Sequence, residues 1–158
     1  MKSKYLFGKI LLTFVVLITV SCDRNRYFEQ NIQIQDNKWV YNEAKVFSFE
    51  LTDTNSLFNF YINTRNTNDY PFANLYVFVN TKFPNQQMAR DTIELQLAYL
   101  NGEWLGSGKG EYKYNQFVLR NAMRFVQQGV YSFSLEQGMR MDTLVGISDI
   151  GIRLEYDQ

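Results

Sequence analysis

Few side chains in this sequence can do nucleophilic or metal chemistry. The chain has one cysteine, Cys22, and no histidine. Catalysis by Ser-His-Asp or Cys-His arrangements therefore has no candidate residues. Histidine-ligated zinc is excluded in the same way, and one thiol cannot build a thiolate zinc site alone. Only carboxylate, lysine and tyrosine chemistry remain open.

The carboxylates of Glu94, Glu103 and Glu111 are the best candidates for such chemistry. Glycoside cleavage needs two carboxyl groups about 5 to 9.5 Å apart. Their neighbours alternate as strand residues do, so we expect these charges on a solvated face. The loop 106–110 with Lys109 resembles a phosphate loop superficially, but the residues after it alternate like a strand. A β-turn or bulge is the better interpretation, and we predict no enzyme activity, metal, cofactor or small-molecule ligand.

Cys22 follows a segment with the pattern of a secretory signal peptide. Residues 1–9 carry three lysines and no acid, residues 10–20 are mostly apolar, and Ser21 is a small residue before the cysteine. The apolar run is shorter than the roughly 20 residues that a spanning helix needs. The order resembles a lipobox, where signal peptidase II cleaves before a lipid-modified cysteine, although Thr19 stands where leucine is commoner.

These features predict a lipoprotein precursor with a signal peptide at 1–21 and lipidation, including palmitate, at Cys22. One acyl chain binds a membrane marginally, whereas two or more anchor a protein stably. We therefore expect a lipid-anchored mature protein. An ordinary signal peptide with an incidental cysteine, or an uncleaved anchor helix, is the alternative.

The mature chain has no excess of basic residues of the kind that nucleic-acid-binding proteins carry. Three of the 16 basic residues and none of the 16 acidic residues precede Cys22, which leaves 13 against 16 and a formal charge near −3. The 13 Phe and 11 Tyr, with many Ile and Val, favour strands. A chain of this length can bury a sizeable core without disulfides.

Period-2 alternation recurs along the chain and predicts an all-β protein. We expect an antiparallel β-sandwich of seven to nine strands, jelly-roll or immunoglobulin-like, as a single domain over 36–158. Residues 22–35 are polar and predict a tether, with an edge strand as the alternative. Residues 115–127 are a weak helix candidate that could equally form a strand. The strands are expected at 46–51, 57–62, 75–79, 92–99, 111–118, 130–136 and 150–156.

The turn-rich loop 68–74 is the candidate for partner contacts, because loops on a rigid scaffold tend to carry function. The predicted contact residues are Asp69, Tyr70, Pro71 and Asn74. The alternative is a proline-fixed turn in which Tyr70 and Phe72 cap the core. Two methionines of the segment 136–141 could likewise adapt to a partner or, more simply, fill the core.

Trp39, Tyr41 and Trp104 could form an aromatic platform for sugars. A carbohydrate-binding module of the envelope is therefore the alternative function. Packing in the core or at an edge is the simpler interpretation, because buried aromatic side chains dominate β cores.

Four segments, taken together with the lipobox and the chain length, resemble the GldH family of gliding-motility lipoproteins of Bacteroidota. The resemblance covers nearly the whole mature domain, with Gly138 where alanine is expected. It implies a cell-envelope protein needed for gliding, whose partners are gliding or type IX secretion proteins, and it offers no catalytic motif. The segments are Arg65 with 69–75, 91–98 with 102–108, 129–133 with 136–140, and Leu144 with 146–153.

The residues after Cys22 bear on which side of the membrane the domain lies. Surface-exported lipoproteins of Bacteroidota tend to carry an acidic cluster soon after the cysteine, and Asp23-Arg24-Asn25-Arg26 is not one. We therefore expect an anchor that faces the periplasm, on the outer membrane.

Overall fold

The computed structural model describes residues 23–157, so the predicted signal peptide and Cys22 lie outside the described residues. Ten β-strands and one short 3-10 turn, η1 (Gln35–Asn37), account for the regular structure of this part of the chain. No helix in it is long and apolar enough to cross a bilayer. The strands are β1 (Arg26–Gln33), β2 (Lys38–Val40), β3 (Lys45–Leu51), β4 (Phe58–Thr67), β5 (Asn74–Lys82), β6 (Met88–Gln96), β7 (Tyr112–Met123), β8 (Gly129–Gln137), β9 (Thr143–Val145) and β10 (Ile147–Tyr156).

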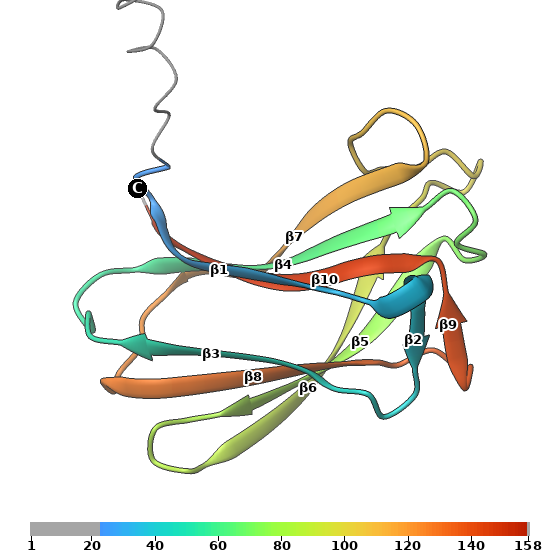
Figure 1. Ribbon diagram of the computed structural model, residues 1–158. Helices are drawn as coiled ribbons and strands as arrows, with labels where there is room; N and C mark the ends of the chain where they lie inside the picture. The colour runs from blue at the N-terminus through green and yellow to red at the C-terminus, as the bar shows by residue number, and fades with distance from the viewer. Residues whose placement is uncertain (1–22, 158) are drawn as a thin grey trace, which may run out of the picture.

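Eight long strands form two antiparallel sheets packed face to face (Figure 1). The strand orders are β1-β10-β4-β7 and β3-β8-β5-β6. The first long strand therefore pairs with the last, the second with the seventh, the third with the sixth and the fourth with the fifth. A long hairpin rolled up in this way is a jelly roll. The predicted all-β sandwich is confirmed, and of the two topologies considered the jelly roll is the observed one.

The core between the sheets follows from the period-2 pattern, because every second side chain of a strand points to the same face. Phe47, Phe49 and Leu51 of β3 are buried, as the alternation predicts, and so is the equivalent face of β4. The ring of Phe133 lies 5.8 Å from Phe49 and 4.8 Å from Phe60, measured between ring centroids. Each large apolar side chain buried in this way contributes about 1.5–3 kcal/mol.

One prediction about local structure is wrong in part, and one alternative that the sequence left open is decided. The polar tether ends early, because 26–33 form edge strand β1, which pairs with β10. At 115–127 the strand alternative holds: residues 115–123 belong to β7, and the rest is the connection that follows it. Both segments lie at sheet edges, where only one side is paired and few side chains enter the core. Their alternation is therefore weak, but backbone pairing to a central strand sets their structure.

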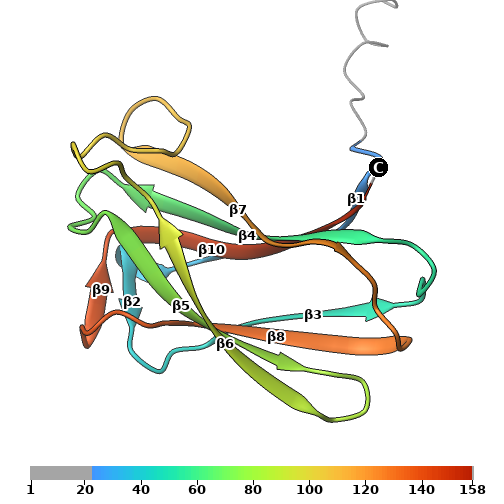
Figure 2. The same cartoon turned by 180° about the vertical axis from the view of Figure 1, so that it is seen from behind.

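The two ends of the sandwich carry different segments (Figures 1 and 2). The end at which the chain enters, called the anchored end here, carries 23–26 and the connections 52–57, 83–87 and 124–128. The opposite end, called the loop end, carries the connections 68–73, 97–111 and 138–142 together with the small β2–β9 pair.

Candidate functional site

The predicted contact loop 68–74 lies at the loop end, and its aromatic residue is part of the core. Tyr70 is 3% exposed, and its hydroxyl donates a hydrogen bond to the carbonyl oxygen of Asn74 at 2.8 Å. Burial raises the pKa of this phenol well above its usual range. Asp69 and Pro71 are exposed. Tyr70 therefore caps the core, and the accessible part of the predicted set is Asp69, Pro71 and the half-buried Asn74.

A shallow groove borders this loop and is called the methionine groove here. Its volume is about 540 Å³. Met139 packs against the core, whereas Met141 is 47% exposed. The sequence presented the loop and the two methionines as separate candidates, and the fold brings them together. The lining residues are Phe72, Tyr76, Gly138, Met139, Arg140 and Met141.

The groove is shaped by close contacts between β5 and the turn after β8. The amide of Gly138 donates to the carbonyl oxygen of Tyr76 at 2.7 Å, and the amide of Tyr76 contacts the sulfur of Met139 at 3.4 Å. A Cβ atom at Gly138 would lie 3.2 Å from the Cβ atom of Tyr76. Glycine at this position therefore lets the methionine turn lie directly on β5, and alanine would push the two segments apart slightly.

Gln137 holds the methionine turn in place, and we did not identify it from the sequence. It is 1% exposed. Its side-chain nitrogen donates to the carbonyl oxygen of Met141 at 2.7 Å, and its side-chain oxygen accepts from the amide of Met139 at 2.9 Å. The sequence does carry a signal for it, because Gln137 occupies the next alternate position after Tyr131, Phe133 and Leu135, and so points into the core like them. A glutamine at a core position needs partners.

A second polar feature lies on the outer face of the β1-β10-β4-β7 sheet. Arg65 of β4 forms an ion pair with Asp149 of β10, and its Nε donates to the hydroxyl of Ser148 at 3.0 Å. The guanidinium carbon also lies 5.1 Å from the ring centroid of Tyr112 and 5.5 Å from that of Tyr114. Arginine prefers such stacked, ion-paired surroundings. This cluster fixes β4, β7 and β10 to one another.

The residues considered for sugar cleavage and for sugar binding do not come together in a shared site. Glu94, Glu103 and Glu111 are all exposed. Among residues 23–157, no group of three potential metal-ligating side chains is present. Trp39 is fully buried and its ring nitrogen donates to the carbonyl oxygen of Glu43 at 2.8 Å, so it packs in the core, as the simpler interpretation predicted, and is not part of an exposed platform.

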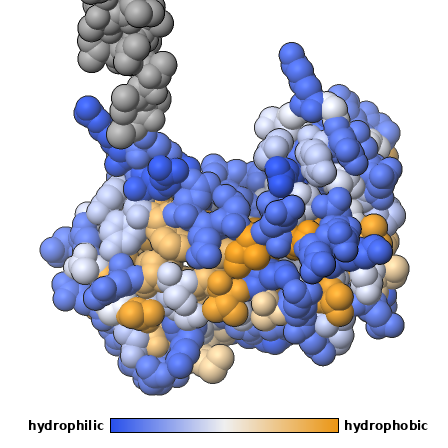
Figure 3. Space-filling view, in the orientation of Figure 1, coloured by the Kyte–Doolittle hydropathy of each residue, from blue (hydrophilic) through white to orange (hydrophobic). Residues whose placement is uncertain are grey.

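The rest of the predicted platform is also scattered. Trp104 is half-buried and packs against the core, and Tyr41 is 50% exposed. The surface seen in Figure 3 carries its hydrophobic colour mainly as a band between the two sheets, with hydrophilic surface on either side. No flat aromatic face is formed by the three residues named for it.

Comparison with known proteins decides the family. The family model described as GldH lipoprotein matches residues 26–154. The chain belongs to the GldH lipoprotein family. A gliding motility lipoprotein GldH homolog from Christiangramia forsetii is 31% identical over 156 residues, with 94% of this chain and 95% of the relative covered. The gliding motility lipoprotein GldH of Flavobacterium johnsoniae is 28% identical over 155 residues, with 94% of each chain covered.

The region matched to the GldH lipoprotein family begins at the first residue of β1 and ends inside β10. It therefore spans nearly the whole jelly roll, including β1, which lies in the segment that the sequence pattern suggested was a tether. The family name also indicates a lipoprotein, which is a membrane-anchored protein of the cell envelope.

Proposed function

We propose that this chain supports gliding motility and type IX protein secretion as a non-catalytic, lipid-anchored protein that acts through contacts with other proteins. The names of two GldH relatives support the link to gliding motility. The position of the methionine groove supports the contact role, because it lies at the loop end, away from the residues that follow Cys22.

The chemistry of the methionine groove suits a protein partner. Methionine side chains are flexible and polarisable, and they adapt to the shape of an apolar partner. Met141 supplies exposed apolar surface, while the neighbouring Arg140 supplies charge at the rim. An apolar centre with a polar rim is the usual composition of a protein–protein interface.

One pair of substitutions tests the contact role. Met141→Lys places a charge in the methionine groove at an exposed position, so the fold should be retained. We expect loss of gliding, and loss of gliding or secretion components from crosslinked envelopes when the protein is pulled down. Met88→Lys is the matched control, because Met88 is 72% exposed and lies outside the groove. Equal behaviour of the two variants would contradict the contact role of the groove.

The membrane attachment and its side are separate parts of the proposal. Cys22→Ala should move the protein from the membrane fraction to the soluble fraction. The segment Asp23–Arg26 lacks an acidic cluster, which supports a periplasm-facing anchor on the outer membrane. Protease added to intact cells should then leave the domain uncut until the outer membrane is permeabilised, and cleavage on intact cells would contradict this side.

A further inference from the structure

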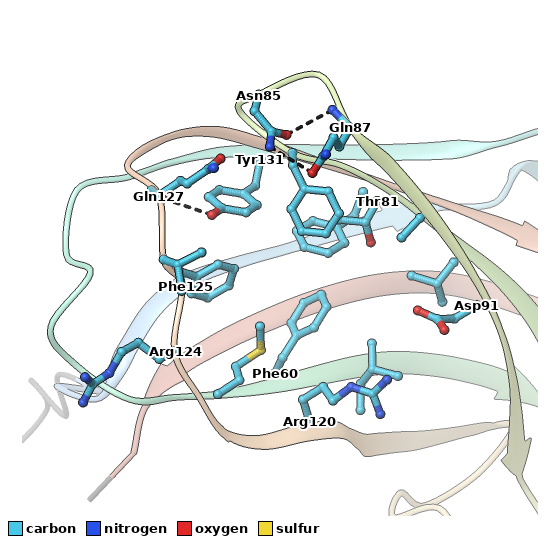
Figure 4. Close-up of a pocket in the computed structure, with 17 residues that line it drawn as sticks. Phe60, Thr81, Asn85, Gln87, Asp91, Arg120, Arg124, Phe125, Gln127 and Tyr131 are labelled. Atoms are coloured by element: carbon cyan, nitrogen blue, oxygen red, sulfur yellow. Dashed lines mark hydrogen bonds between the residues drawn. The ribbon is translucent and has the colours of Figure 1, made fainter.

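A deep cleft opens between the two sheets near the anchored end, on the side of β6 and β7 (Figure 4). Its volume is about 390 Å³. Aromatic rings from both sheets and from the connections 83–87 and 124–128 form its floor and walls, and smaller polar groups lie at its mouth. The aromatic lining residues are Phe60, Phe83, Phe125, Tyr131 and Phe133.

The cleft exists because the edge strands of the two sheets do not close over each other. Asp91 of β6 pairs with the buried Val79 of β5, so both face inward. Ala89 has the same parity. Yet Ala89 and Asp91 are exposed. The inner face of β6 is thus left open at positions that would normally belong to the core.

An irregularity in β7 supplies a cation to the same cleft. The pairing of β4 with β7 shifts register on both sides of Phe60, which pairs with Arg120. Directly paired residues share a face, and Phe60 faces the core, so Arg120 is turned inward. Figure 4 shows Arg120 and Asp91 on opposite walls. Among the described residues, Arg120, Arg124 and Asp91 form no ion pair with one another or with other groups.

The anchored end, where the cleft lies, is close to the lipid-bearing residue. Cys22 and Arg26 are four positions apart in the sequence, which limits the span between them to about 14 Å. Tyr27 contacts Phe58 at 5.3 Å, and Phe58 contacts the cleft residue Phe125 at 5.6 Å, measured between ring centroids. A lipid on Cys22 would therefore bring this end of the sandwich, with its cleft, against the membrane surface.

We propose that the cleft holds one acyl chain of a zwitterionic phospholipid from the membrane to which the protein is anchored. A methylene group occupies about as much space as a water molecule, about 30 Å³, so the cleft has room for roughly a dozen. Arg120 faces the phosphate, and Asp91, on the opposite wall, faces the ammonium group of an ethanolamine head. The proposal rests on membrane attachment through Cys22.

The experiment reconstitutes the full lipidated protein in vesicles of phosphatidylethanolamine that carry a photoreactive diazirine in one acyl chain. After irradiation, lipid-modified peptides are mapped by mass spectrometry. We expect modification within 79–91 and 119–133. Ala89→Trp fills the cleft from an exposed edge position and should lower this modification by about an order of magnitude. Thr92→Trp, on the outer face of the same strand, is the matched control.

The outcomes separate the two proposals. Flotation of the protein with the vesicles reports the anchor, whereas the map of modified residues reports the cleft. Arg120→Gln leaves the apolar lining intact and should reduce modification from phosphatidylethanolamine. Modification restricted to exposed loops, or equal yields for Ala89→Trp and Thr92→Trp, would overturn the assignment even when flotation is normal.

Discussion

The guanidinium of Arg153 in β10 binds the carboxylate of Asp23, the residue that directly follows Cys22. The same guanidinium pairs with Glu29 at 2.7 Å and with Glu155. The amide of Tyr156 also donates to the carbonyl oxygen of Asn25 at 2.8 Å. The chain therefore joins the folded domain almost immediately after the predicted lipidation position, and a lipid there would leave the domain little freedom to move away from a membrane.

Asp23→Asn should release this junction. The amide keeps the shape of the carboxylate but loses the charge that binds Arg153, so hydrogen exchange of residues 24–30 should become faster. The rest of the domain should exchange as before, because exposed ion pairs contribute little to global stability. Asp69→Asn, at the loop end, is the control and should leave exchange at 24–30 unchanged.

The same junction should depend on pH. The hydrogen bond from Arg153 lowers the pKa of Asp23 below its ordinary value of 3.8. A depressed carboxyl pKa in the folded state stabilises the junction above pH 3.8, and this contribution is lost as pH falls through the lowered pKa. The protection of the amides at 24–30, relative to an unfolded chain at the same pH, should therefore fall below about pH 4 in the wild type. A pH profile of Asp23→Asn that also shows this step would contradict the assignment to Asp23.

Tyr70→Phe tests the buried tyrosine of the contact loop. The substitution removes the hydrogen bond to Asn74 and leaves that carbonyl oxygen unpaired, at a cost of about 1–2 kcal/mol in the free energy of unfolding. Burial raises the pKa of Tyr70, so above pH 10 the phenol ionises first in the unfolded state and the stability of the wild type falls. The stability of Tyr70→Phe should therefore fall less than that of the wild type above pH 10. Tyr76→Phe, at a 38% exposed tyrosine, is the control and should leave the melting temperature unchanged.

The sequence predicted the parts of the fold in which one face of a strand is apolar throughout. Phe47, Phe49 and Leu51 show this directly, and their burial follows from parity alone. β1 was only the alternative to a tether, because its inward positions include Gln30 beside Phe28 and Ile32, so polar residues dominate the segment. Whether the sandwich is a jelly roll depends on which strands pair across the chain, and alternation carries no information about pairing.

The candidate site was predicted less well than the fold, because its residues are brought together by contacts between distant segments. Phe72 and Met141 lie far apart in the sequence and line one groove. The cleft at the anchored end depends on a register shift in β7, and a local pattern cannot locate such a shift. For Tyr70 the sequence left partner contact and core capping open, because a loop residue can still point into the core, as this one does.

Gln137→Ala tests the support of the methionine groove. It removes the partners of the Met139 amide and the Met141 carbonyl group, and unpaired polar groups of this kind cost about 1–3 kcal/mol each. Unfolding in urea should show a lower midpoint with an unchanged slope. Gln96→Ala is the matched control: Gln96 also donates to a carbonyl oxygen, that of Ala98 at 2.7 Å, but it is exposed. The free energy of unfolding of Gln96→Ala should differ from that of the wild type by no more than about 0.5 kcal/mol.

Gly146→Ala tests how closely the contact loop packs against Gly146, the residue between β9 and β10. Gly146 has φ +93°, and a Cβ atom there would lie 2.8 Å from the Cα atom of Tyr70. Gly102 has a similar φ of +85°, but nothing lies within 4 Å of its Cβ position. Both alanine variants carry the strain of a positive φ, about 1–2 kcal/mol. Only Gly146→Ala must also displace backbone, which should add about 1–3 kcal/mol.

The comparison of the two glycine variants by thermal unfolding therefore isolates the contact with Tyr70 from the strain of the backbone conformation. Combining Gly146→Ala with Tyr70→Phe should give less than the sum of the two effects, because residues in contact are coupled. Gly102→Ala combined with Tyr70→Phe should be additive, since the two residues do not touch. Equal destabilisation by Gly146→Ala and Gly102→Ala would mean that the loop moves freely, and a rigid contact surface at 68–74 would then be untenable.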